Sequence, residues 1–179
     1  MSEQIKPLNI KHYGVSPWEI NVITSILDKR FLTEDEEIEN TYEEKYVSHL
    51  EILFPYSFND EFFKWFDYKE WDRLKGVFKE MKRRRGDGKA LRIELNFSGE
   101  PDINFIIQSD QSQWFKMEVE KIDFVVELLP YHLDEEKIPK GVKKVIYNFD
   151  QEAARWRLNT VFANEKKFMN SQKGWKLST

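Results

Sequence analysis

A run of cations is the feature of this sequence best suited to a chemical role. It comprises Lys82, Arg83, Arg84, Arg85 and Lys89, which surround the glycine-containing segment 86–88. Lysine and arginine neutralise phosphate groups, so such a run can bind nucleic acid. The same cations also suit the last turn of a helix, where they stabilise the negative end of the helix dipole. The sequence leaves both interpretations open.

A second basic stretch, with a tryptophan among its lysines, lies between residues 166 and 176. Aromatic rings can stack on unpaired bases beside such cations. Three predicted helices, followed by a basic loop and a hairpin, resemble a winged helix-turn-helix protein in outline. That resemblance implies a nucleic-acid-binding regulator. The acidic segment 34–44 and the net charge of −4 depart from it.

Nine aromatic residues fall between Phe54 and Trp71. One helix cannot bury all of them against a single core, so part of the set is expected at the surface. We predict an aromatic binding surface formed by Phe62, Trp65 and Tyr68, because exposed aromatic patches mark interfaces. The alternative is a wedge of core residues with tyrosine and tryptophan at its wet rim.

Residues that could perform catalysis do not form a recognisable motif. The chain has no cysteine, its three histidines are widely separated, and its glycines match neither phosphate-binding pattern. Asp102, Glu118 and Glu120 resemble part of the PD-(D/E)xK nuclease motif, but Glu120 stands where that motif has lysine. We therefore predict no catalytic residues, no metal site and no cofactor. An enzyme whose site is assembled from distant residues stays an alternative.

Length and composition indicate one domain spanning residues 1–179. Hydrophobic residues make up 40% of the chain and aromatic residues 15%, which is enough for a core. No apolar run is long enough to span a membrane, and the first residues lack the pattern of a secretory signal. These features predict a cytoplasmic protein.

Helices are the main elements predicted in the first half of the chain. Ser16, Pro17 and Glu19 form a capping-box pattern that predicts a helix over 17–30. A second such pattern at Thr33 and Glu36 predicts a helix over 34–44. Over 45–54 the spacing of the apolar residues fits both a helix and a strand. A short turn is expected near 59–66. A longer helix follows over 67–85, with Trp71, Leu74, Phe78 and Met81 on its buried face.

Alternating patterns then predict strands over 91–97, 103–108, 114–129 and 142–149. For residues 150–168 both helix and strand fit, and helix is the prediction. The residues after 169 are expected to form an ordered or frayed tail. Short turns between the first three strands favour an antiparallel meander. We expect an α+β fold whose helices pack on one face of an antiparallel sheet of about four to five strands.

The combined pattern predicts a non-catalytic interaction or regulatory protein that binds protein through the aromatic surface, with self-association as its simplest form. The alternative is a nucleic-acid-binding regulator that uses the basic cluster. The sequence does not identify a small-molecule ligand.

Overall fold

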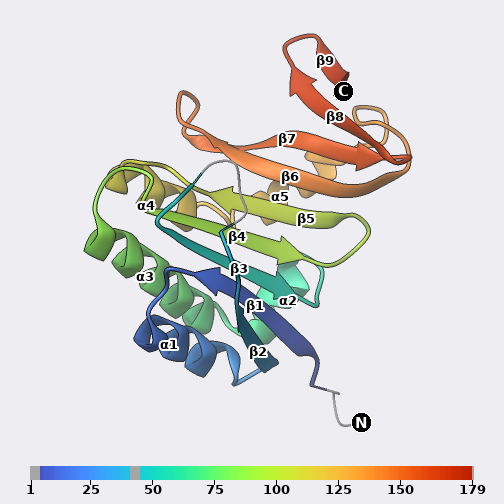
Figure 1. The fold of residues 1–179 in the computed structure, drawn as a ribbon. Helices are drawn as coiled ribbons and strands as arrows, with labels where there is room; N and C mark the ends of the chain where they lie inside the picture. The colour runs from blue at the N-terminus through green and yellow to red at the C-terminus, as the bar shows by residue number, and fades with distance from the viewer. Residues whose placement is uncertain (1–4, 41–44, 179) are drawn as a thin grey trace.

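The computed structural model describes residues 5–40 and 45–178 of the chain. In this part of the chain one sheet of nine strands forms the framework, with the strand order β2-β1-β3-β4-β5-β6-β7-β8-β9 (Figure 1). The strands are β1 Pro7–Tyr13, β2 Leu32–Glu37, β3 Ser48–Phe54, β4 Leu91–Phe97, β5 Asp102–Ile107, β6 Val142–Asp150, β7 Arg155–Ala163, β8 Lys166–Ser171 and β9 Gly174–Ser178. The helices are α1 Pro17–Leu27, α2 Asp60–Phe66, α3 Tyr68–Arg85, α4 Ser112–Glu120 and α5 Val125–His132.

The sheet is mixed, so the prediction of a four- to five-stranded antiparallel sheet is wrong. β1 pairs with β2, β3 with β4, and β5 with β6 in parallel, and the remaining neighbours are antiparallel. A parallel pair needs a crossover connection, which is usually helical. α1, then α2 with α3, and then α4 with α5 supply these three crossovers.

All five helices lie on one face of the sheet (Figure 1). Because they share that face, the strand order gives the third crossover, from β5 to β6, the opposite hand to the first two. From β6 onward the chain continues as an antiparallel meander to β9.

The core lies between the helices and the central strands. Leu91, Ile93, Leu95 and Phe97 of β4 are fully buried, as their alternation predicts. The helix prediction over 67–85 is also confirmed, since α3 buries the four side chains expected to face the core: Trp71, Leu74, Phe78 and Met81. The apolar residues of β4 recur at every second position and those of α3 at every third or fourth position. Each element therefore has one apolar face, and these two faces pack against each other.

The N-terminus of α1 is joined to the C-terminus of α3 by a buried ion pair. Ser16 and Glu19 form the predicted capping box. The Glu19 carboxylate also accepts two hydrogen bonds from the Arg85 guanidinium, at 2.7 and 2.8 Å. Arg85 donates further to Ser48 Oγ and to the carbonyl oxygens of Met81 and Gly14. This clamp connects both helices to β3.

The predicted helix over 34–44 is wrong for the residues described there. Residues 32–37 form β2, which pairs in parallel with β1, and residues 41–44 lie outside the described residues. Thr33 does not cap a helix, because its hydroxyl donates to the Asp28 carboxylate. Pairing with β1 outweighs the local helix signal. The open choice over 45–54 resolves to a strand, β3.

The predicted long strand over 114–129 is also wrong, because this segment forms α4 and α5. Its buried residues include Phe115, Val119, Ile122 and Val125, which recur at the spacing of one helical face. The aromatic and β-branched residues of the segment also allow the alternating interpretation.

The prediction of a helix over residues 150–168 is also wrong. Residues 155–163 form β7, which buries Trp156 and Leu158 against the helices. The strand expected over 142–149 is confirmed as β6. The expected tail is a hairpin of β8 and β9.

None of the helices in the described part of the chain is both long and apolar enough to cross a membrane.

The Glu19–Arg85 clamp makes stability depend on pH in the acid range. Burial alone would raise the pKa of Glu19, but hydrogen bonds from Arg85 and Ser16 outweigh it and hold the pKa at about 2. A carboxyl group whose pKa is lower in the folded state than in the unfolded state stabilises the fold. This contribution is fully present above the pKa of the unfolded state and is lost as the pH falls toward the pKa of the folded state. The stability gap between the wild type and Glu19→Gln should therefore narrow between about pH 4.5 and pH 2.

Thermal unfolding of both proteins across this pH range measures the gap. The other carboxylates are common to both proteins and cancel in the comparison. A gap that stays constant with pH would contradict the ion pair.

Candidate protein-binding surface

The predicted basic cluster is divided between buried and exposed positions. Lys82 is fully buried, and its Nζ donates to the carbonyl oxygen of Gly88 at 3.1 Å. Arg85 is taken up by the clamp with Glu19. Arg83 is exposed and pairs with Glu80 one turn earlier in α3. Arg84 and Lys89 are exposed as well. Two of the five predicted cations, Lys82 and Arg85, are therefore engaged within the fold, and the other three remain at the surface.

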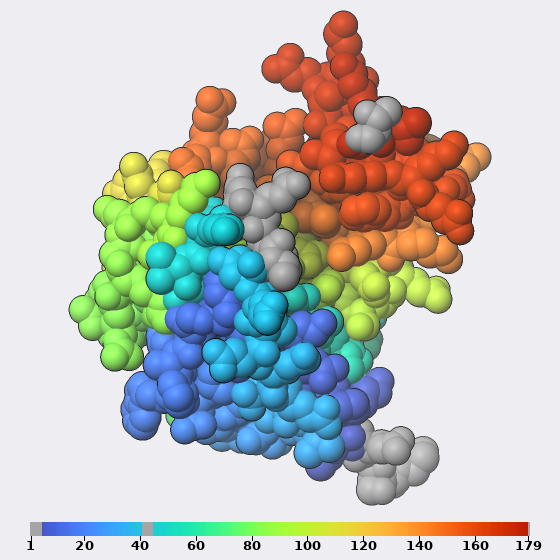
Figure 2. Space-filling view, in the orientation of Figure 1, coloured from blue at the N-terminus to red at the C-terminus, as the bar shows by residue number. Residues whose placement is uncertain are grey.

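The second basic stretch begins on β8, which β5, β6 and β7 separate from β4, the strand that Lys89 precedes. Lys166 and Lys167 are exposed on β8, and Lys173 and Lys176 lie in the hairpin that β8 forms with β9. This hairpin is at one end of the sheet, whereas the acidic strand β2 forms the other end (Figure 2).

The three residues of the predicted aromatic surface differ in their exposure to solvent, although the rings of Phe62 and Trp65 are in contact. Phe62 is 3% exposed and contacts the rings of Phe54 and Phe97 in the core. Trp65 is half-buried against Phe31. Tyr68 is 45% exposed and stacks with Phe63. Of the three, Tyr68 is the residue that presents a large aromatic area to solvent.

Helix α5 presents a larger apolar surface that the sequence did not reveal. Phe124 at its N-cap is 63% exposed, Leu128 is 40% exposed and Tyr131 is 67% exposed. Residues spaced by four and three positions lie on one face of a helix. The opposite side of α5 contacts the core through Val125. We call Phe124, Leu128 and Tyr131 together the α5 stripe.

Sequence periodicity misses the α5 stripe because it favours a strand over residues 114–129. In a strand, Phe124 would lie on the same face as Ile122 and Val126 and would be expected in the core. The helical spacing of 124, 128 and 131 was present in the sequence, but the competing set at 115, 119, 122 and 125 shows the same spacing. Sequence periodicity does not say which of two apolar faces is buried.

Asp123 fixes the start of α5 against α3. Its Oδ1 accepts a hydrogen bond from Trp71 Nε1 at 3.2 Å and another from Lys75 Nζ at 3.1 Å. Burial raises the pKa of Tyr68, and the nearby carboxylates of Asp60 and Asp123 raise it further. Tyr68 lies one helical turn before Trp71 in α3, and Trp71 donates to Asp123, the residue that precedes Phe124 of the α5 stripe.

Charges near the α5 stripe have both signs. Glu127, Glu135 and Glu136 are exposed on α5 and on the segment after it. Tyr131 lines a pocket together with the exposed cations Lys137, Arg155 and Arg157. A partner of this surface would meet apolar side chains bordered by both carboxylates and cations.

The carboxylates of the nuclease-like pattern are not brought together. Asp102 begins β5 and accepts from the Gly99 amide, whereas Glu118 accepts from the Gln108 amide just beyond the other end of β5. Glu120 pairs with Lys79 and Lys75. Within residues 5–40 and 45–178, no group of three or more histidine, aspartate or glutamate side chains is placed to hold a metal ion.

The sheet topology and the α5 stripe define a mixed α+β fold with an exposed apolar face on one helix. Comparison with known proteins adds no relative: the sequence matches no protein-family model and no curated protein, and the fold matches no solved structure.

Asp123→Ala should destabilise the fold by about 2–3 kcal/mol, because it leaves the buried Trp71 indole N–H unpaired and removes one carboxylate from Lys75. Asp123→Asn keeps an acceptor for the indole and should lose less. Urea unfolding of the three proteins measures the difference. If Asp123→Ala unfolded at the wild-type midpoint, Asp123 would not anchor α5.

Proposed function

We propose that this chain is a non-catalytic interaction protein that binds a partner protein through the α5 stripe, with Tyr68 at its edge. The observation that carries the proposal is the exposure of three large apolar side chains on one face of a single helix. Scattered apolar residues are normal on a protein surface, but a contiguous group marks an interaction site.

The energetics favour burial of the α5 stripe by a partner. Burying a large apolar side chain that was exposed contributes about 1.5–3 kcal/mol. Phenylalanine and tyrosine also lose little side-chain entropy on binding, because each has two side-chain torsions. Three such residues could form the centre of an interface, where aromatic residues are enriched.

The spacing and charge of the surface also describe the partner. Apolar residues at positions i, i+4 and i+7 of a helix fit an apolar groove on another protein. Glu127 is exposed on α5 itself, whereas Lys137 and Arg155 line a pocket with Tyr131, so the groove that fits the stripe best carries charges of both signs at its border.

The alternative of nucleic-acid binding has less support. Lys82 and Arg85 are engaged within the fold, and the exposed members of the cluster stand apart from the basic hairpin of β8 and β9. We therefore do not propose it as a second function. The cytoplasmic location expected from the sequence stays a prediction.

Replacing Phe124, Leu128 and Tyr131 by serine should abolish partner binding while preserving the fold, because all three side chains face solvent. A matched control replaces Trp18, Leu32 and Leu177 by serine, since these residues are exposed to a similar degree elsewhere. The wild type, the control and the α5 variant are each immobilised as bait. A partner protein that the wild type and the control retain, but the α5 variant does not, is then purified. Its dissociation constant, measured by calorimetry, should rise by a factor of about 100 or more in the α5 variant.

Light scattering of the wild type at increasing concentration tests a second copy as the partner. A mass increase that the α5 variant lacks would identify self-association. Equal retention of every protein by all three baits, with no mass change, would contradict the proposal.

A further inference from the structure

A pocket lies between the end of α5, the first half of β7 and the hairpin of β8 and β9. Its volume is about 310 Å³, at the lower end of the range of small-molecule sites. β8 pairs with residues 160–163 of β7, whereas residues 155–158 of the same strand line the pocket. The rest of the lining includes Tyr131, His132, Lys137, Asn170 and Trp175. We call this the β7 pocket.

Hydrogen bonds within the fold hold the walls of the β7 pocket in place. Asn170 Nδ2 donates to the carbonyl oxygen of Leu158 at 2.9 Å, which joins β8 to the part of β7 that lines the pocket. His132 Nδ1 lies 2.9 Å from the hydroxyl of the buried Tyr147 on β6. These bonds fix the walls before any ligand arrives, which is the property of a preformed site.

The charges inside the β7 pocket have one sign. Among the described residues, the charged side chains that line it are all cations: Lys137, Arg155 and Arg157. All three are exposed, so a ligand in the pocket can reach them from solvent. The chain as a whole carries a net charge of −4, and the pocket therefore concentrates positive charge against the balance of the sequence. Such a concentration attracts an anion.

The cations of the β7 pocket are available to a ligand. Within the described part of the chain, the side chains of Lys137 and Arg155 have no hydrogen bond or ion pair. Arg157 has a carboxylate near it, but its Nη1 lies 3.7 Å from Asp150 Oδ2, which is beyond hydrogen-bond distance. Asp150 itself does not line the pocket.

The acids that precede Lys137 along the chain do not line the β7 pocket either. Asp134 accepts a hydrogen bond from the backbone amide of Glu136. Glu135 lines a separate pocket beside Pro101. The positive side chains are therefore the charged groups that a ligand meets in the β7 pocket.

Aromatic rings lie beside these cations. Tyr131 at the end of α5 is 67% exposed, and Trp175 of β9 is half-buried. A planar ring of a ligand can stack on such side chains. The pocket thus suits a molecule that joins an aromatic ring to an anionic group.

The number of cations favours phosphate as the anionic group. A phosphate monoester carries close to two negative charges at neutral pH and has three terminal oxygens that accept hydrogen bonds. The planar fork of an arginine matches two such oxygens at once. A carboxylate has one charge and two oxygens, so it would leave part of this set of donors unused.

We propose that the β7 pocket binds a nucleoside monophosphate and holds its phosphate through Lys137, Arg155 and Arg157. The base stacks on Tyr131 or Trp175. The sequence has no glycine-rich phosphate loop, so side chains rather than backbone amides hold the phosphate. Partner binding by the α5 stripe is a separate property, although Tyr131 belongs to both surfaces.

Calorimetric titration of the full chain at fixed ionic strength tests this proposal. The probes are the monophosphates of adenosine, guanosine, cytidine and uridine, with the four nucleosides and ribose 5-phosphate as comparators. At least one monophosphate should bind, and it should bind about tenfold or more tightly than its own nucleoside and than ribose 5-phosphate. In a nuclear magnetic resonance titration it should shift the backbone amide signals of Lys137 and Arg157 and the indole signal of Trp175.

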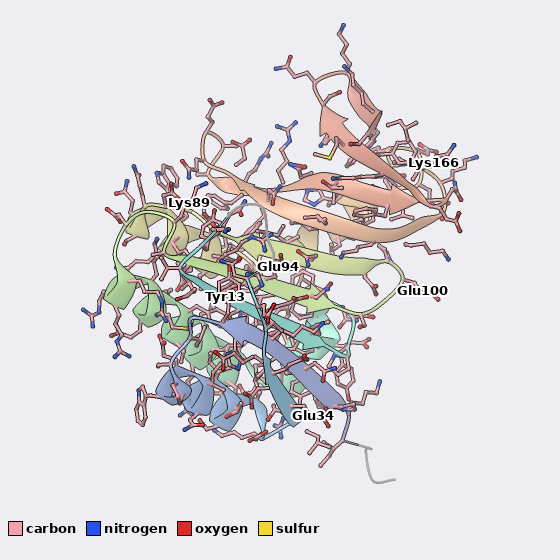
Figure 3. All side chains as sticks on the ribbon, viewed as in Figure 1. Tyr13, Glu34, Lys89, Glu94, Glu100 and Lys166 are labelled. Carbon is pink, nitrogen blue, oxygen red and sulfur yellow. The ribbon has the colours of Figure 1, made fainter. Side chains whose placement is uncertain are left out.

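The double variant Lys137→Gln and Arg155→Gln should weaken binding of that monophosphate by about tenfold or more, because it removes two charged donors to the phosphate. The matched control is Lys166→Gln and Lys167→Gln, which removes the same charge from the start of β8, outside the pocket (Figure 3 labels Lys166). Its affinity should equal that of the wild type. All four side chains are exposed, and equal thermal midpoints would show that both variants keep the fold.

A second control keeps the two proposed sites apart. Phe124→Ser with Leu128→Ser changes the α5 stripe at residues that do not line the β7 pocket, so nucleotide affinity should not change. A failure of nucleotide binding would therefore leave the proposal for the α5 stripe standing.

Four results would overturn the proposal. They are that no monophosphate binds at millimolar concentration, that the nucleoside binds as tightly as its monophosphate, that ribose 5-phosphate does so, or that both lysine-containing double variants weaken binding equally.

Discussion

Burial of one face of the central strands against α3 is the constraint on which the rest of the structure depends. β3 and β4 are parallel neighbours, so the chain between them must cross the sheet, and α2 and α3 make that crossing. The crossing places Trp71 and Phe78 over the fully buried residues of β4. Arg85 at the end of the same helix then pairs with Glu19, which orients α1. Apolar burial supplies the driving force, and the buried ion pair fixes the geometry.

The same crossover arrangement determines which surfaces are free for binding. Because all helices cover one face, α5 must pack over the β5–β6 part of the sheet, and its second apolar face is left toward solvent (Figure 1). The parallel pairing of β5 with β6 requires the crossover that α4 and α5 make, and this connection places α5 where it is. The sheet also separates charge, with Glu34 near one end and Lys166 near the other (Figure 3).

Sequence reasoning succeeded where a local signal and its tertiary environment agree. The capping box at Ser16, the amphipathic period of α3 and the alternation in β4 each specify an element that the fold also requires. It failed at residues 34–40, where β1 offers an unpaired edge, and at 114–129, where two periods fit the same residues. Of the predicted binding residues, Tyr68 is exposed as an aromatic surface requires, whereas Phe62 is buried in the core.

The sequence by itself determined the apolar faces of the strongest elements and the lack of any cysteine chemistry, because these depend on residue type and short-range spacing. Only the tertiary structure decided the direction of each strand, since parallel and antiparallel pairing depend on contacts between distant residues. It also decided which cations pair with other groups of the fold and which apolar side chains are exposed to solvent. A side chain's availability for binding depends on its neighbours in space, and residues far along the chain supply most of them.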